Sequence, residues 1–189
     1  MRYDWAAGAA LAASLGFAAQ VAAAAGPLAG ENLLAPTAAG FVLSESATQR
    51  SVSMMEYVPR GETVDSWSRM ITVLIYKGYR RVDGDVWLAE TGKRWIASCE
   101  KGGAQKVKSG VENGFPFTLW AMSCPLNPRT GKPENTYFKA ISGDESFYMA
   151  QYAVREPFSP EQAPPMIGYL RQVIACDTRR KGRSCPVDD

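Results

Sequence analysis

This chain lacks one of the residue types that most often carry out enzyme chemistry, because its 189 residues include no histidine. Histidine is the usual general base near neutral pH and the commonest metal ligand. Its absence excludes a Ser-His-Asp triad, a Cys-His nucleophile pair and a zinc site with imidazole ligands. Catalysis by this protein would therefore have to use carboxylates, tyrosines or lysines.

Carboxylates gather in two short segments. Asp83, Asp85 and Glu90 lie near the start of a predicted helix, and Asp144 and Glu145 share a predicted turn. A glycosidase needs two carboxyl groups on either side of a cleft at a defined separation. Helix caps and turns use the same residue types at the same places. The carboxylates therefore predict caps and turns first, and a hydrolase as the alternative.

The four cysteines are Cys99, Cys124, Cys176 and Cys185. An even number in an exported chain predicts two disulfides, for which three connectivities exist. We expect Cys99–Cys124 and Cys176–Cys185, the second of which closes a short loop near the C-terminus. No C-x-x-C spacing occurs, so the cysteines do not predict a zinc site. No cofactor is predicted either, since the Thr-Gly-Lys runs at 91–93 and 130–132 lack the remainder of a P-loop.

The predicted C-terminal disulfide loop supplies four candidate anion-binding residues, Arg179, Arg180, Lys181 and Arg183. A stapled basic loop suits an anionic envelope component such as a lipid headgroup, a polysaccharide or a phosphate. The alternative is a solvated tail, because short charge clusters are common near chain ends. Another envelope protein is the second partner class that we consider. Nucleic acid is not expected to be a partner of an exported protein.

The N-terminal region predicts export. Residues 6–25 form an Ala-rich, weakly hydrophobic run with small residues at Ala23 and Ala25. Signal peptidase reads this A-x-A spacing, so we expect residues 1–25 to be a Sec-type signal peptide that is cleaved near Ala25. The alternative is a retained membrane anchor. An Ala run is only weakly hydrophobic and this one has little flanking charge, so the sequence disfavours an anchor. The processed chain would be periplasmic or secreted, with no stable transmembrane segment.

The rest of the chain predicts one α+β domain over residues 41–189, after an Ala-, Pro- and Gly-rich extended lead-in over 26–40. Apolar periodicity predicts strands over 41–46, 51–58, 70–76, 105–111, 115–124, 137–142 and 146–154. Helical spacing predicts helices over 83–99 and from 165 to about 176, the second behind a capping box that begins at Ser159. Hairpins follow one another without intervening helices. We therefore expect a single antiparallel sheet of about six to seven strands, packed against two main helices and stapled by disulfides.

Several runs of the sequence together carry a family resemblance. They are EYVPRGETVDSWSRMITV at 56–73, SCPLNP at 123–128, TGKPE at 130–134, FKAI at 138–141 and CDTR at 176–179. In these runs the chain resembles a family of small exported proteins of Gram-negative bacteria that has no assigned activity. The resemblance implies a periplasmic or secreted location and adds no functional residues.

The sequence therefore favours a non-catalytic, exported binding or accessory protein of the cell envelope, because no complete catalytic set accompanies the export signal and the paired cysteines. The alternative is an envelope hydrolase that acts on glycan or peptidoglycan through carboxylates. A third possibility is a purely structural partner of another envelope protein, which an exposed edge strand would favour.

Overall fold

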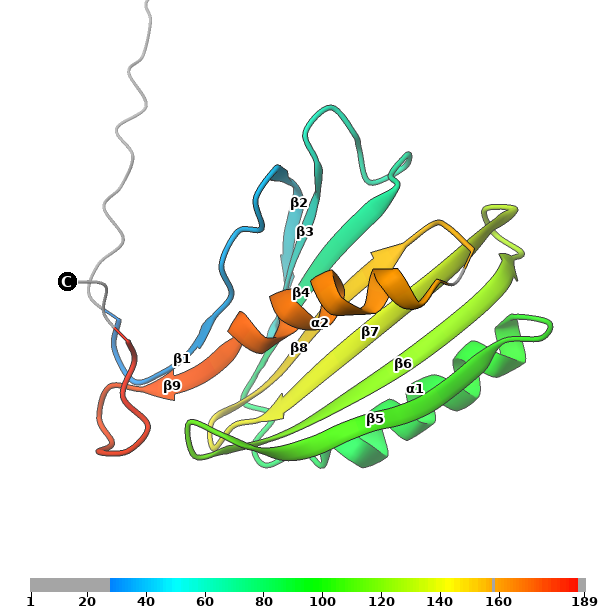
Figure 1. Ribbon diagram of the computed structural model, residues 1–189. Coiled ribbons are helices and arrows are strands. Elements are labelled where there is room, and N and C mark those ends of the chain that lie inside the picture. The colour runs from blue at the N-terminus through cyan, green and yellow to red at the C-terminus, as the bar shows by residue number, and fades with distance from the viewer. Residues whose placement is uncertain (1–27, 158, 187–189) are drawn as a thin grey trace, which may run out of the picture.

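The computed structural model describes residues 28–157 and 159–186, so the predicted signal peptide lies outside the described residues. The described chain is an α+β fold built on a seven-stranded antiparallel sheet (Figure 1). The strands lie in the order β2-β3-β4-β8-β7-β6-β5. Their bounds are β2 Phe41–Gln49, β3 Val52–Pro59, β4 Arg69–Lys77, β5 Gly103–Glu112, β6 Phe115–Asn127, β7 Lys132–Ser142 and β8 Ser146–Val154. The expected antiparallel sheet is confirmed, with all seven predicted strands present.

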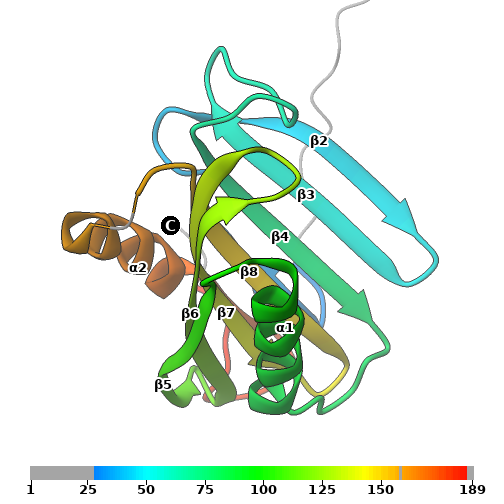
Figure 2. The ribbon, with the colours of Figure 1, turned by 90° about the vertical axis from the view of Figure 1, so that its right-hand side faces the viewer.

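Two helices cover opposite faces of this sheet (Figure 2). Helix α1 (Gly84–Ser98) buries Leu88 against a cluster that includes Met122 and Phe138. Helix α2 (Ala163–Gln172) follows the 3-10 turn η1 (Pro160–Gln162) and buries Met166 and Leu170 in the larger cluster on the other face. No helix within the described residues has the length and apolar character needed to cross a membrane.

Local sequence signals set the helix starts. The Asp83 side chain caps α1, because its Oδ1 accepts hydrogen bonds from the backbone N–H groups of Asp85 and Val86 at 2.9 and 3.1 Å. Ser159 and Gln162 form the predicted capping box before α2. Gly92 lets α1 approach the sheet, since a Cβ atom at this position would lie 2.8 Å from Cβ of Ala104. The expected residues thus cap α1 and the 3-10 turn that leads into α2.

The second helix ends earlier than the sequence pattern predicts, and this expectation was wrong. Helix α2 stops at Gln172, and Ile174–Asp177 forms strand β9 instead of the last helical turn. Strand β9 pairs antiparallel with β1 (Glu31–Leu34), which lies within the expected lead-in. The β-branched side chains of Val173 and Ile174 favour this extended conformation. The chain ends are therefore joined by a two-stranded sheet that the periodicity did not reveal.

Two disulfides staple the fold as expected. Cys99 at the end of α1 is bonded to Cys124 on β6, and Cys176 on β9 is bonded to Cys185. All four cysteines lie in the described part of the chain, and each belongs to a disulfide. Such pairing is typical of proteins that mature in an oxidising compartment outside the cytoplasm.

Candidate functional site

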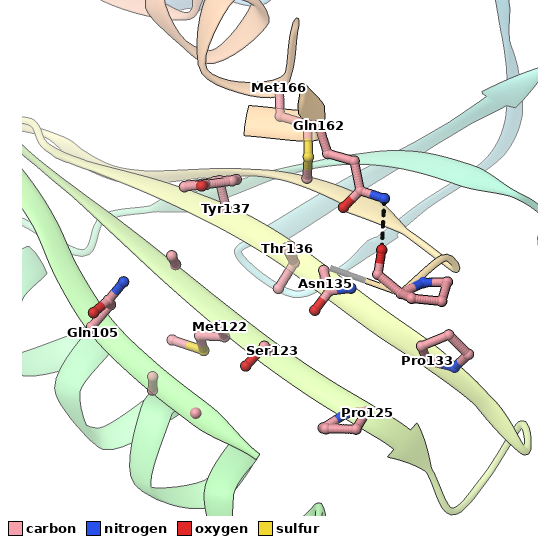
Figure 3. A pocket seen from close by; sticks show the side chains of 14 residues that line it. Gln105, Met122, Ser123, Pro125, Pro133, Asn135, Thr136, Tyr137, Gln162 and Met166 are labelled. Carbon is pink, nitrogen blue, oxygen red and sulfur yellow. Dashed lines mark hydrogen bonds between the residues drawn. The ribbon is translucent and has the colours of Figure 1, made fainter. Parts of the chain in front are cut away.

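The side chains of strand β6 change from large to small along the face that α2 covers. Phe117 and Leu119 are buried in the core on this face. Ala121 and Ser123 continue the same face, because alternate residues of a strand point the same way, but their side chains are small. The sheet surface is therefore left unfilled beside η1 and the start of α2, and a groove opens there (Figure 3).

Polar groups border this small-residue floor. Gln105 on β5 and Tyr137 on β7 lie on either side of Ala121 in the sheet register. Asn135, two residues before Tyr137, is buried, and its Nδ2 donates a hydrogen bond to the Glu156 carbonyl oxygen at 2.6 Å. Burial raises the pKa of the Tyr137 hydroxyl, so this group stays protonated at neutral pH and can donate a hydrogen bond.

The segment that leads into α2 forms the opposite wall. Gln162 holds it in shape, since its Nε2 donates to the Pro157 carbonyl oxygen at 3.0 Å and its Oε1 accepts from the Ser159 N–H at 3.3 Å. Figure 3 shows Gln162 and Met166 facing the strands across the groove. The capping box that starts α2 therefore also fixes one side of the groove.

The groove has a volume of about 740 Å³. Ligand sites in proteins commonly enclose about 300–1,000 Å³ and combine an apolar lining with a few polar groups. The lining residues are Gly103, Ala104, Gln105, Ala121, Met122, Ser123, Pro125, Pro133, Asn135, Thr136, Tyr137, Pro157, Gln162 and Met166. Every one of these lining residues is uncharged, so the groove suits the apolar or neutral part of a ligand.

The candidate anion-binding residues lie elsewhere, at the other end of the sheet. Arg179 binds two carboxylates, with its Nη2 2.9 Å from Asp177 Oδ2 and its Nη1 2.8 Å from Glu145 Oε1. The Asp177 side chain is buried, so this contact anchors the loop to the fold. The Arg179 guanidinium thus has protein carboxylates as its partners.

The other cations of the loop divide into two kinds. Arg180 and Arg183 converge on Asp144, with their Nη1 atoms 2.8 and 2.6 Å from its Oδ2. Lys181 is exposed to solvent. None of these residues lines the groove. Their role in binding an external anion stays a prediction. The ion pairs of Arg180 and Arg183 with Asp144 fasten the C-terminal loop to the turn between β7 and β8.

The carboxylates near α1 serve the structure. Glu90 pairs with Lys93 one helical turn away at 2.6 Å, and Asp85 forms an ion pair with Lys106 on β5. Burial tends to raise the pKa of Asp85, but its hydrogen bonds, above all that from Lys106, outweigh this effect and lower the pKa. The expected helix cap is present at Asp83, whereas Asp85 and Glu90 form ion pairs in addition, and neither Asp85 nor Glu90 lines the groove.

The groove residues are the ones that the sequence analysis missed. The signal that could have located them is the change along β6 from Phe117 and Leu119 to Ala121 and Ser123 on one face. That signal indicates a hollow only when the end of the covering helix is known. The position of α2 over the sheet is a tertiary property, so the pattern alone was insufficient.

Comparison with known proteins does not assign the chain to a family. No protein-family model matches the chain, and no curated protein matches it. Among solved structures, the chain is similar to the crystal structure of LpqN, described as involved in cell envelope biogenesis of Mycobacterium tuberculosis. The two share 12% identity with a TM-score of 0.40, over 80% of this chain and 86% of that chain.

Proposed function

We propose that this protein is an exported, non-catalytic binding protein of the cell envelope. Its ligand would place an apolar body, such as the acyl chain of an envelope lipid, in the groove between the sheet and α2. The uncharged, largely apolar lining of this groove is the observation that carries the proposal. The neutral polar groups of Gln105, Asn135 and Tyr137 would orient the polar end of the ligand at the border.

The disulfides support the location in this proposal. Two disulfides fit a protein that folds in the periplasm or outside the cell. The Sec-type signal peptide and its cleavage near Ala25 stay predictions. Mass spectrometry of the exported protein should show an N-terminus near Gly26.

The groove does not support the hydrolase alternative. A hydrolase that works through carboxylates needs at least one acidic side chain at the reacting bond. Among the described residues that line the groove, none is acidic. The lining of this groove therefore supports binding, and a carboxylate mechanism would have to use another hollow, such as the one lined by Asp83, Asp85 and Asp144.

The experiment uses the exported, processed protein. Organic extraction and mass spectrometry would identify lipids that co-purify with it, and the stripped protein would then be titrated with the fluorescent fatty acid cis-parinaric acid. Ala121→Trp should fill the floor of the groove and weaken binding of the probe by about tenfold or more, equivalent to about 1.4 kcal/mol. Gln105→Trp narrows the groove from its exposed edge and provides a second variant with little risk to the core.

The matched control is Ser109→Trp, an exposed position on β5 outside the groove, which should leave probe affinity unchanged. Circular dichroism and thermal unfolding would establish that each variant is folded. The proposal fails if the stripped protein does not bind the probe. It also fails if folded Ala121→Trp and Gln105→Trp both bind the probe as tightly as the unaltered protein.

A further inference from the structure

A second hollow, of about 550 Å³, lies on the other face of the sheet, beyond the C-terminal end of α1. We name it the polar pocket, and its charged and indole side chains are those of Glu56, Asp65, Trp67, Trp95, Arg129, Glu134 and Arg155. Most of its wall comes from residues 56–70 and 124–134, the same segments on which much of the family resemblance rests.

The sheet separates the polar pocket from the groove. Glu134 on β7 lines the polar pocket, whereas its neighbour Asn135 lines the groove. Successive residues of a strand point to opposite faces, which explains this division. Trp95 of α1 reaches the polar pocket and is fixed there, because its Nε1 donates to the Ser123 carbonyl oxygen at 2.9 Å. A ligand in the polar pocket would therefore touch neither Gln162 nor Met166 of the groove.

The most distinctive group in the polar pocket is the Arg155 guanidinium, which stacks on the Trp67 ring with its Cζ 3.8 Å from the ring centroid. Stacking on an indole stabilises a guanidinium and fixes its orientation. Within residues 28–157 and 159–186, Arg155 makes no ion pair, and its Nε is buried without a hydrogen-bond partner. Buried polar groups without a hydrogen-bond partner are uncommon in native proteins, so the unpartnered Nε of Arg155 points to a ligand that accepts its hydrogen bond.

Acidic side chains share the same wall. Glu134 is held in place by Asn127, whose Nδ2 donates to its Oε2 at 2.8 Å. Glu56 on β3 accepts a long hydrogen bond of 3.5 Å from Thr72, and burial raises the pKa of its carboxyl group. The polar pocket thus offers acceptors from glutamates and donors from arginines, without an ion pair between them in the described residues.

We infer that the polar pocket binds a saccharide. A hydroxyl group both donates and accepts hydrogen bonds, so a sugar can satisfy carboxylates and guanidinium groups in the same site. The C–H face of a pyranose ring packs on an indole, and Trp95 is the partly exposed indole of this pocket. A simple anion would meet Glu56 and Glu134, and a simple cation would meet Arg129 and Arg155. This mixed lining therefore disfavours a ligand with a single sign of charge.

The test uses the exported, processed protein and three neutral probes: chitotetraose, maltotetraose and cellotetraose. Saturation-transfer NMR and tryptophan fluorescence at millimolar sugar should detect binding of at least one of them. Arg155→Gln and Glu134→Gln preserve size and remove charge, and each should weaken that sugar by about tenfold, as expected for loss of a charge-assisted hydrogen bond. Glu100→Gln changes an exposed carboxylate outside the pocket and should have no effect.

Two further measurements distinguish sugar binding in the polar pocket from ligand binding in the groove. Ala121→Trp should leave sugar binding intact, because Ala121 lines the groove and not the polar pocket. Arg155→Gln should leave binding of cis-parinaric acid intact. The inference is overturned if none of the three sugars binds, if folded Arg155→Gln and Glu134→Gln both bind sugar normally, or if a tetrapeptide binds this pocket and the sugars do not.

Discussion

Lys139 is a buried cation that joins α2 to the sheet. Its side chain is 2% exposed, forms an ion pair with Glu112 and lies with Nζ 5.0 Å from the centre of the Phe117 ring. The ammonium also donates to the carbonyl oxygens of Leu170 and Val173 at 3.1 and 2.8 Å. Burial lowers the pKa of Lys139, and the Glu112 carboxylate opposes this shift. A cation at these carbonyls is favoured by the negative end of the α2 dipole.

Replacing Lys139 by methionine should therefore destabilise the fold. Lys139→Met keeps most of the buried volume but leaves Glu112 and two helix carbonyls without their donor. We expect the free energy of unfolding to fall by about 2–3 kcal/mol, the scale of losing hydrogen bonds to a charged group. Lys108→Met, at an exposed position on β5, is the control and should change it by less than about 0.5 kcal/mol. Equal midpoints in denaturant for the two variants would contradict this role of Lys139.

Asp177 makes the stability of the C-terminal loop depend on acid. Arg179 donates from Nε to Oδ1 and from Nη2 to Oδ2, both at 2.9 Å. The hydrogen bonds from Arg179 lower the pKa of Asp177 to about 2. A carboxyl pKa that is lower in the folded state stabilises the fold above its unfolded value of about 3.9. This contribution is lost as the pH falls through about 2.

The difference in unfolding free energy between the unaltered protein and Asp177→Asn should therefore be largest near neutral pH and shrink below about pH 4. Denaturant unfolding at neutral pH and near about pH 2 would measure it. A gap that stays constant over this range would show that the carboxylate charge does not contribute.

At the scale of elements, the first residue of strand β1 fastens this strand to a turn of the main sheet. The Glu31 carboxylate accepts hydrogen bonds from the backbone N–H groups of Asp144, Glu145 and Ser146 at 2.7, 3.1 and 3.0 Å. The preceding Gly143 makes room for this contact, because a Cβ atom there would lie 2.2 Å from Glu31 Oε1. The turn between β7 and β8 is thus closed by a residue more than a hundred positions away.

Glu31→Ala should release this turn. The variant leaves three backbone donors with only water as a partner, and we expect a loss of about 1.5–3 kcal/mol. Hydrogen exchange of the Asp144 to Ser146 amides should accelerate more than exchange at the centre of β6. Glu45→Ala, on the exposed edge strand β2, is the control and should affect neither quantity. Unchanged exchange in the turn would remove Glu31 from this role.

The elements that the sequence predicted are those defined by local signals. The seven main strands follow from apolar periodicity, and the starts of α1 and α2 follow from Asp83 and Ser159. Strands β1 and β9 were not predicted, because they pair with each other across almost the whole length of the chain, as Asn32 does with Cys176. A strand of four residues is also too short to show a periodic pattern. Neither hollow was predicted, because each depends on where a helix ends over a sheet.

At the scale of the whole molecule, the disulfides define two closed loops of different length. The Cys99–Cys124 loop spans 25 residues and the Cys176–Cys185 loop spans 9. Chain entropy predicts that removing the longer bridge with paired Cys→Ser substitutions costs about 3–4 kcal/mol, and removing the shorter one about 2–3 kcal/mol. Denaturant unfolding of the two double variants would test this order. Thiol labelling of the denatured, exported protein should find no free cysteine, and four reactive thiols would refute both bridges.

Strand β6 connects the two proposed sites through its pairing with β7. Ala121 and Ser123 line the groove, while Cys124 lines the polar pocket on the other face of the sheet. Slippage of β6 by one residue would turn every one of these side chains to the wrong side. A single-residue deletion between Phe117 and Ala121 should therefore abolish recognition of both ligands at once, whereas insertions in the exposed turn around Arg50, which lines neither site, should spare both.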